Sequence, residues 1–236
     1  MRWLVTLAVL AGLAFAGWAW LRKHPEDSPW APLDLSQPVG MFTGRKLVKL
    51  TQDFPRCRSL LDRAGVGYTV LAEVREGDTC GYADGIRFAP DDPHITPFSP
   101  ANLGTSCPVA AALALWEWEV VQPAAERHFR MRVTQIEHLG SYNCRRMYGR
   151  SSGDFSLHAT ADAVDISGFL LADGTRVTLV ADWTKGGARA AFLRDVRSGA
   201  CGLFSTVLSP DYNAAHRDHL HLDQADRGSM GWRSCR

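Results

Sequence analysis

The chain has 236 residues, of which 46% are hydrophobic and 22% charged, with 26 lysines and arginines against 25 aspartates and glutamates. This is the composition of a globular protein, and it excludes an intrinsically disordered chain, a collagen and a simple coiled coil. The formal net charge of +1 provides none of the strongly basic character that marks nucleic-acid-binding proteins, so no nucleic-acid partner is expected.

The N-terminus carries an apolar segment. Residues 3–21 contain no charged side chain and are flanked by arginine and lysine. A helix of roughly 20 apolar residues spans a bilayer, whereas Ala14-Phe15-Ala16 has the small-x-small form of a signal-peptide cleavage site. We therefore expect export to the cell envelope. Residues 1–23 act either as a single-pass inner-membrane anchor of a periplasmic domain or as a cleaved signal of a soluble periplasmic protein.

The first half of the remaining chain is rich in residues that interrupt helices and strands. Residues 24–40 contain four prolines and few periodic apolar side chains, which is typical of a linker. Residues 57–74 predict a helix that stops at Gly65, followed by a strand. Residues 81–106 are rich in proline, glycine and aspartate, and we expect loops with at most short strands.

The second half contains both helices and strands, but they do not follow a regular β-α-β order. A helix is predicted from Pro108 to Gln122, with Pro123 near its end, because proline is favoured in the first helical turn. A strand over residues 131–139 follows. The turn Ala172-Asp173-Gly174 predicts a hairpin. The two strands of this hairpin cover residues 163–171 and 176–181. The next helix covers residues 184–198, and the final strand covers residues 219–223.

These elements indicate an α+β fold, with a small antiparallel sheet and flanking helices. We divide the chain into an N-terminal segment, a linker, the N-terminal portion of the domain and the main domain. The four parts cover residues 1–23, 24–40, 41–102 and 103–236.

Six dispersed cysteines follow the apolar segment, and none forms a CxxC pair. An even number of cysteines in an exported chain predicts three disulfides, with 15 connectivities open. A strand that retraces the preceding helix would bring Cys144 to Cys107. Cysteines on either side of the final strand would also meet. The expected pairs are therefore Cys107–Cys144, Cys201–Cys235 and Cys57–Cys80.

Two histidine segments carry candidate chemistry. His158 lies in a predicted loop, seven residues before Asp165, which lies in a strand. In the final strand, side-chain alternation places His219, His221 and Asp223 on one face and the intervening leucines on the core side.

Imidazole nitrogens and a carboxylate oxygen are standard ligands of Zn²⁺, and a catalytic zinc keeps one open position beside three protein ligands. His158, Asp165 and one histidine of the His219/His221 pair would supply that set. Asp218 is the candidate to accept a proton from a water molecule, and His219 to stabilise an oxyanion. The remaining isolated histidines are expected to be surface or hydrogen-bonded polar residues: His24, His94, His128 and His138.

The pattern S-x-H-x-x-A-x-A-x-D followed by D-H-L-H-L resembles the zinc site of the lysostaphin/D-Ala-D-Ala peptidase/hedgehog (LAS) metallopeptidases. Residues from about 103 to 236 resemble the extensin-like C-terminal domain family. The matching stretches are CPVAAALALWEWEVVQPAAERHF, GSYNCR, SLHATADAVDISGF and HRDHLHLD.

The resemblance implies a hedgehog/D-Ala-D-Ala-peptidase-like fold and assigns roles to individual residues. His158, Asp165 and His221 would be the zinc ligands, Asp218 the acidic general base, and Arg145 a bidentate partner of a substrate carboxylate. The chain departs from the pattern at Ala161, where glycine is common; this change is mild only if the local φ is negative.

Two functions from different classes follow. The first is a zinc metallopeptidase that hydrolyses amide bonds in the peptide stems or cross-links of bacterial peptidoglycan. The second is a non-catalytic, zinc-stabilised binding or structural domain of the cell envelope. A third alternative is a domain that is stabilised by disulfides and whose histidines form only a polar surface. The expected partners are peptidoglycan, the membrane and an unidentified activator protein.

Overall fold

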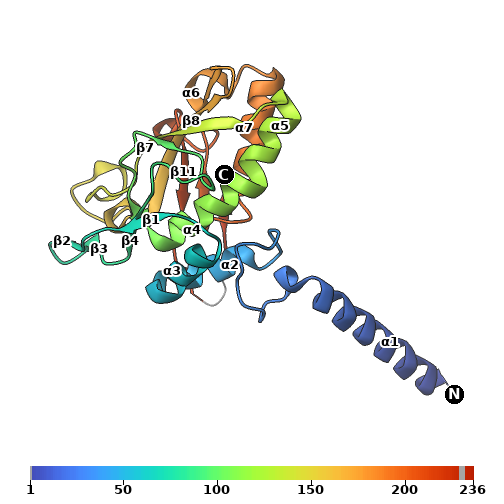
Figure 1. The fold of residues 1–236 in the computed structure, drawn as a ribbon. Coiled ribbons are helices and arrows are strands. Elements are labelled where there is room, and N and C mark those ends of the chain that lie inside the picture. Colours follow the sequence, from blue (N-terminus) through green and yellow to red (C-terminus); the bar gives the residue numbers. More distant parts are fainter. Residues whose placement is uncertain (1, 229–231) are drawn as a thin grey trace.

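The structure, a computed structural model, describes residues 2–228 and 232–236. Helix α1 (Arg2–Lys23) extends away from the rest of the molecule, and none of its residues is buried (Figure 1). Within the described residues it is the one helix long and apolar enough to cross a membrane. This agrees with a signal or an anchor at the N-terminus.

The segment after α1 lies against the domain rather than forming a free linker. A short 3₁₀ turn, η1 (Pro25–Asp27), begins two residues after α1 ends. Leu33 and Leu35 are both buried in the hydrophobic core. The expectation of a plain tether over residues 24–40 is therefore wrong, because two leucines six to eight residues after the 3₁₀ turn bury their side chains.

The helices and strands of the domain are arranged as one α+β unit around a core that runs from Leu33 to Leu222. The helical elements are α2 (Thr43–Val48), η2 (Lys49–Gln52), α3 (Phe54–Arg63), α4 (Cys107–Trp116), η3 (Glu117–Val121), α5 (Gln122–Phe129), η4 (Met147–Gly149), η5 (Leu157–Thr160), α6 (Leu179–Asp182), α7 (Gly187–Ala200) and η6 (Ala214–His216). The strands are β1 (Tyr68–Val70), β2 (Val74–Glu76), β3 (Cys80–Tyr82), β4 (Gly85–Phe88), β5 (Phe98–Ser99), β6 (Thr105–Ser106), β7 (Val133–Gly140), β8 (Ala163–Leu171), β9 (Arg176–Thr178), β10 (Thr206–Leu208), β11 (Leu220–Asp223) and β12 (Ser234–Cys235).

The main sheet has the order β12-β10-β11-β8-β7-β5, and β9 pairs with the second half of β8. Most pairs are antiparallel; β5–β7 and β10–β12 are parallel. The β1-β4-β6 sheet and the β2–β3 hairpin are separate and small. The expected α+β class with a small antiparallel sheet is confirmed, as is the hairpin that joins β8 to β9. The short strands β10 and β12 were not expected.

Helix α4 forms the centre of the core, because every one of its ten residues is buried. Trp116 at its end donates from Nε1 to the carbonyl oxygen of Val196 in α7, 2.8 Å away. The rings of Trp116 and Phe192 both pack against Phe169 of β8. Helices α4 and α7 are thereby fixed against the sheet that carries the candidate site (Figure 1).

The helix does not end near Pro123, contrary to expectation. It passes through a π-helical turn, η3, and continues as α5 to Phe129, where Arg130 adopts a left-handed conformation (φ 54°). Proline lacks an N–H and clashes with the carbonyl four residues earlier in a regular α-helix. The wider π turn directly before Pro123 accommodates both effects.

All six cysteines are disulfide-bonded, but in a different pattern from the expected one. The pairs are Cys57–Cys107, Cys80–Cys144 and Cys201–Cys235, of which only the last was predicted. The other two pairings, Cys107–Cys144 and Cys57–Cys80, are wrong. Helix α3 packs on α4 and brings two fully buried cysteines together, which leaves Cys144 to meet the β2–β3 hairpin.

Candidate metal centre

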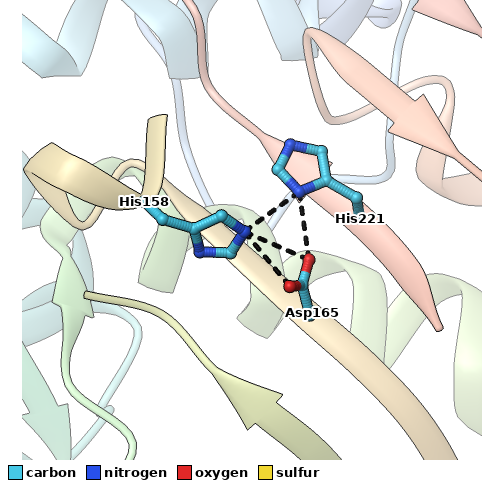
Figure 2. Close-up of side chains that lie close together, drawn as sticks. All are labelled: His158, Asp165 and His221. Carbon is cyan, nitrogen blue, oxygen red and sulfur yellow. Dashed lines mark hydrogen bonds and ion pairs between the residues drawn. The ribbon is translucent and has the colours of Figure 1, made fainter. Parts of the chain in front are cut away.

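The candidate site lies on two adjacent strands of the main sheet. Strands β8 and β11 pair antiparallel, and His221 lies directly opposite Asp165 in their register. Alternation along β11 buries Leu220 and Leu222 completely, as expected, and leaves His221 on the other face. Its Nδ1 lies 3.0 Å from Oδ1 of Asp165 (Figure 2). Strand register alone therefore joins two residues that are 56 positions apart.

His158 reaches the same point from the 3₁₀ turn η5. The Ser156 side chain caps this turn by accepting a hydrogen bond from the His158 backbone N–H, at 3.3 Å. The His158 ring is buried, and its Nδ1 lies 2.6 Å from the backbone carbonyl oxygen of Ser141. A carbonyl only accepts hydrogen bonds, so Nδ1 carries the proton. The second ring nitrogen, Nε2, faces Asp165 and His221, and it can coordinate a metal when the ring is neutral.

The three donor atoms have the spacing of a tetrahedral metal site. Nε2 of His158 lies 3.2 Å from Nδ1 of His221 and 3.2 Å from the Asp165 carboxylate (Figure 2). Zinc bonds of about 2.0–2.1 Å at tetrahedral angles place ligand atoms roughly 3.3 Å apart. Two imidazole nitrogens and one carboxylate oxygen also have the chemistry that Zn²⁺ accepts. These residues are therefore suited to hold a divalent metal ion.

A second carboxylate supports His221 from behind. Nε2 of His221 lies 3.4 Å from Oδ2 of Asp223, a buried residue two positions further along β11. Burial lowers the pKa of His221, but the hydrogen bonds to the Asp165 and Asp223 carboxylates outweigh it and raise the pKa to about 9. A histidine that donates its second N–H to a carboxylate is the usual arrangement of a metal ligand.

Asp165 is the acidic centre of the cluster. Burial raises the pKa of its carboxyl group, but hydrogen bonds from His158 and His221 reverse that effect and hold the pKa below its ordinary value. The carboxylate is therefore kept ionised, which is the form that binds a cation.

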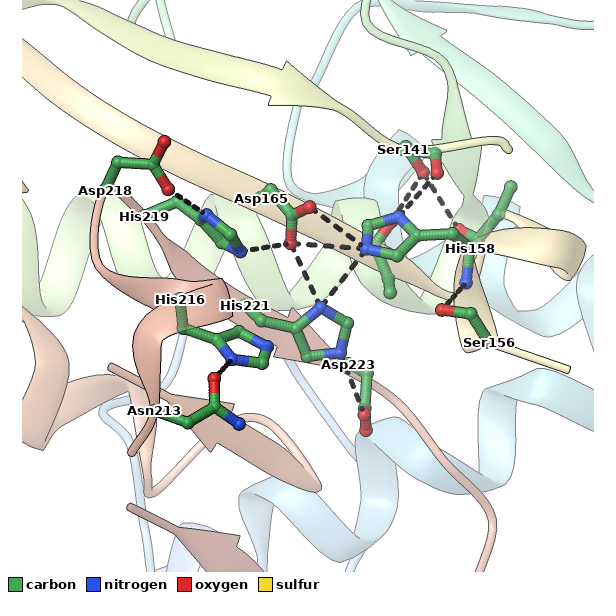
Figure 3. A network of polar contacts seen from close by, with 12 residues as sticks. Ser141, Ser156, His158, Asp165, Asn213, His216, Asp218, His219, His221 and Asp223 are labelled. Atoms are coloured by element: carbon green, nitrogen blue, oxygen red, sulfur yellow. Dashed lines mark hydrogen bonds and ion pairs between the residues drawn. The ribbon is translucent and has the colours of Figure 1, made fainter. Parts of the chain in front are cut away.

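Asp218 and His219 form a pair beside this cluster (Figure 3). Nδ1 of His219 lies 2.9 Å from Oδ1 of Asp218, and Nε2 of the same ring lies 3.5 Å from Oδ1 of Asp165. His219 is mostly buried, whereas the Asp218 side chain is 43% exposed. The histidine therefore faces the cluster, and Asp218, the expected proton acceptor, lies behind it.

His216 belongs to the site but received no role from the sequence. It lies in η6, a buried position, and its ring centre is 5.2 Å from that of His219 and 5.9 Å from that of His221. Asn213 Oδ1 lies 2.8 Å from its Nδ1. Burial, and then the charges of His219 and His221, lower the pKa of His216 to about 4. The clustering of three histidines within six residues was the only sequence signal for it.

The cluster opens into a cavity of about 170 Å³. Arg145, which was expected to bind a substrate carboxylate, lines this cavity together with Tyr148, Ser156 and His216. Asp218 is not among the lining residues. The cavity wall thus carries a guanidinium group as well as the three candidate ligands.

Ala161 has a left-handed backbone conformation, with φ at 57°. The condition under which alanine would be a mild replacement for glycine is therefore not met. A non-glycine residue in this region costs roughly 1 kcal/mol. Its carbonyl oxygen accepts a hydrogen bond from the Ser106 N–H, so this conformation helps to place the turn that carries His158.

The four isolated histidines are hydrogen-bonded, as expected. His24 contacts Glu26, His94 contacts Asp92, His128 contacts Asp195, and His138 contacts the carbonyl oxygen of Pro100.

Residues 55–236 match the family described as Extensin-like protein C-terminus, and the chain belongs to this family. The match includes every residue of the cluster and all six cysteines. No curated protein and no solved structure was found to match the chain.

Proposed function

We propose that this protein is a zinc-dependent hydrolase of amide bonds in the peptide stems or cross-links of bacterial peptidoglycan. The observation that carries the proposal is the convergence of His158 Nε2, His221 Nδ1 and the Asp165 carboxylate within 3.0–3.2 Å of one another. This donor set matches the ligand pattern of LAS metallopeptidases, and we infer a related, hedgehog/D-Ala-D-Ala-peptidase-like arrangement of the main domain.

His158, Asp165 and His221 would hold the zinc ion. When bound, zinc supplies a Lewis acid that polarises a carbonyl group and lowers the pKa of water. The protein prepares this site through Ser141 and Asp223, which fix the ring orientation of the two histidines.

Proton movement would fall to the Asp218–His219 pair. Asp218 accepts the Nδ1 hydrogen of His219, which leaves Nε2 directed towards Asp165. In this division of work His219 exchanges a proton with the reacting groups, and Asp218 orients the ring and stabilises its charged form. This differs from the direct role that the sequence pattern assigns to Asp218.

Substrate orientation would come from Arg145 on the cavity wall. A guanidinium group binds a carboxylate through two parallel hydrogen bonds, and peptide stems of peptidoglycan carry carboxylates. The cavity volume of about 170 Å³ fits a side chain or a chain end rather than a folded partner.

Three disulfides and an apolar N-terminal helix support work outside the cytoplasm. We propose an inner-membrane anchor with a periplasmic domain. Cleavage after Ala16 would instead release the domain, and mass spectrometry of the mature N-terminus distinguishes the two forms.

The decisive test is digestion of purified sacculi by the zinc-loaded protein, followed by separation of the released muropeptides. Wild type should release cleaved stems or cross-links, and His158→Ala should release none; His94→Ala, which removes a histidine outside the site, should match wild type. Intact sacculi after incubation with zinc-loaded wild type, with and without envelope extract to supply an activator, would contradict hydrolysis.

The exposure of Asp218 favours one second candidate, a zinc-stabilised envelope-binding domain without catalysis. A carboxylate that is 43% exposed and outside the cavity lining is a poor proton acceptor for a buried reaction. Binding of the zinc-loaded protein to sacculi without release of muropeptides would identify this function.

A further inference from the structure

A second cavity, of about 500 Å³, lies between the α2–η2 region and the segment after β11. Four cationic side chains line it: Arg45, Lys49, Arg227 and Arg233. Asp226 is the one carboxylate among the described lining residues. This local excess of positive charge contrasts with the net charge of +1 for the whole chain.

Arg233 lines this cavity, and its guanidinium group is partly held by the chain. Its Nη1 donates to the carbonyl oxygen of Cys201, at 3.1 Å, whereas its Nη2 is buried and has no partner among the described residues. Burial, and then the charge of Arg45, lower the pKa of Arg233. Within the described residues no ion pair compensates the charge of Arg233, so an anion in the cavity would be stabilised by this charge.

The backbone of α2 is adapted to this guanidinium group. A Cβ atom at Gly44 would lie 1.6 Å from Nη2 of Arg233, so a larger residue at position 44 would displace the arginine.

The carboxylate of Asp226 does not neutralise the cations. Its Oδ2 accepts a hydrogen bond from Gln52, at 2.9 Å, and within the described residues no ion pair joins it to an arginine or lysine. Arg227 is held by the Ser205 carbonyl and the Thr206 hydroxyl, and its guanidinium carbon lies 4.7 Å from the ring centre of the exposed Trp232.

The cavity is near the end of the apolar helix. Asp27 of η1 accepts a hydrogen bond from the Met41 N–H, at 2.7 Å, and Lys46 of α2 donates to the Glu26 carbonyl oxygen. Only His24 separates η1 from the end of α1. Helix α1 leaves the domain on the side where α2 and α3 lie (Figure 1). In the anchored protein this side faces the bilayer.

We propose that this cavity binds the phosphate group of an anionic ligand, which an anionic phospholipid headgroup supplies in the anchored protein. Arginine forks match the oxygen geometry of phosphate, and basic side chains next to a membrane helix are attracted to anionic headgroups. Trp232 provides an amphipathic ring of the kind enriched at the membrane–water interface.

The test uses the full chain in lipid nanodiscs and follows amide hydrogen exchange in residues 43–52 and 224–228. One arm compares phosphatidylcholine with phosphatidylcholine plus phosphatidylglycerol; a second adds inorganic phosphate to phosphatidylcholine discs. Occupancy at ten times the Kd should slow exchange by about tenfold. Slowing by phosphatidylglycerol alone supports the headgroup, and slowing by inorganic phosphate as well shows that the phosphate group suffices.

Arg45→Gln/Lys49→Gln should abolish the slowing, and both positions are exposed, so the fold should be preserved. Arg56→Gln/Arg63→Gln removes the same charge from the neighbouring helix α3 and should have no effect. Equal loss in the two double variants, or no slowing in either arm, would overturn the proposal. The readout involves neither zinc nor hydrolysis, so its failure leaves the proposed function unaffected.

Discussion

The carbonyl oxygen of Ser141 lies 2.6 Å from Nδ1 of His158, and the hydroxyl group of the same serine donates to the carbonyl oxygen of Ala163, at 2.6 Å. Ser141, which directly follows β7, therefore orients a candidate metal ligand through its backbone carbonyl and binds β8 through its side chain. A backbone acceptor cannot be removed by substitution, so the orientation of His158 depends on the position of this segment.

Ser141→Ala should lower stability without loss of metal. The variant loses a buried hydrogen bond, which is worth about 1 kcal/mol, but keeps the carbonyl group that holds His158. Chemical unfolding should show the lower stability, and metal analysis should show unchanged zinc. Loss of zinc would mean that the hydroxyl group, rather than the carbonyl, positions the ligand.

Removal of zinc should lower the unfolding temperature of wild type, and its return should restore it. A ligand that binds only the folded state stabilises it, by about 2.7 kcal/mol at 100 times its Kd. His221→Ala should bind no stoichiometric zinc, and its unfolding temperature should not respond to a chelator. His128→Ala, which lies outside the cluster, serves as the control. An unchanged response in His221→Ala would remove this residue from the ligand set.

Asp218 and His219 should behave as one unit in hydrolysis. His219→Ala and Asp218→Asn should each reduce turnover on sacculi by about 10²-fold or more with zinc retained, because both remove the same proton-transfer group. If Asp218 acts only through His219, the double variant should be no slower than His219→Ala alone. Multiplied effects in the double variant would restore the independent role of Asp218 as general base.

Asp84 should make stability depend on pH. Burial, and then the charge of Asp162, raise the pKa of Asp84 from 3.8 to about 6. Protonated Asp84 therefore favours the folded state, and this contribution, fully present below pH 3.8, is lost as the pH rises through about 6.

Asp84→Asn removes the partly buried charge and should stabilise the protein by about 2 kcal/mol at neutral pH, after a discount for solvent screening, and little at about pH 4. Unfolding free energies at the two pH values check this, with Asp91→Asn, an exposed carboxylate, as control. Equal stabilisation at both pH values would show that charge is not the cause.

The parts of the molecule that sequence could predict are those governed by local rules. Alternation along β11 predicted that Leu220 and Leu222 face the core and His221 the other side. The His158 to Asp165 spacing, with the final strand, predicted a set of side chains that the structure brings together. The hairpin at Ala172-Asp173-Gly174 followed from turn chemistry alone.

The parts that it could not predict depend on packing between distant segments. Cys57 pairs with Cys107 because α3 lies on α4, a contact that no local pattern encodes. His216 enters the site through the fold of the loop before β11. The hydrogen bond from His219 to Asp218 places His219, rather than Asp218, next to the cluster. The adjacency of the two residues in the sequence does not reveal this arrangement.

The burial of Leu33 and Leu35 limits the distance over which an anchored form of this protein can act. If residues 24–40 were free and extended, these 17 residues would allow the domain to lie up to roughly 55 Å from its membrane helix. Because that segment is packed against the domain, the distance from the membrane that the protein can cover is set by the size of the domain itself. A domain of this size has a radius of gyration of about 17 Å. The yellow to golden loop between β7 and β8 lies on the side away from α1 (Figure 1). The anchored form would therefore contact only cell-wall material that lies within one domain diameter of the bilayer.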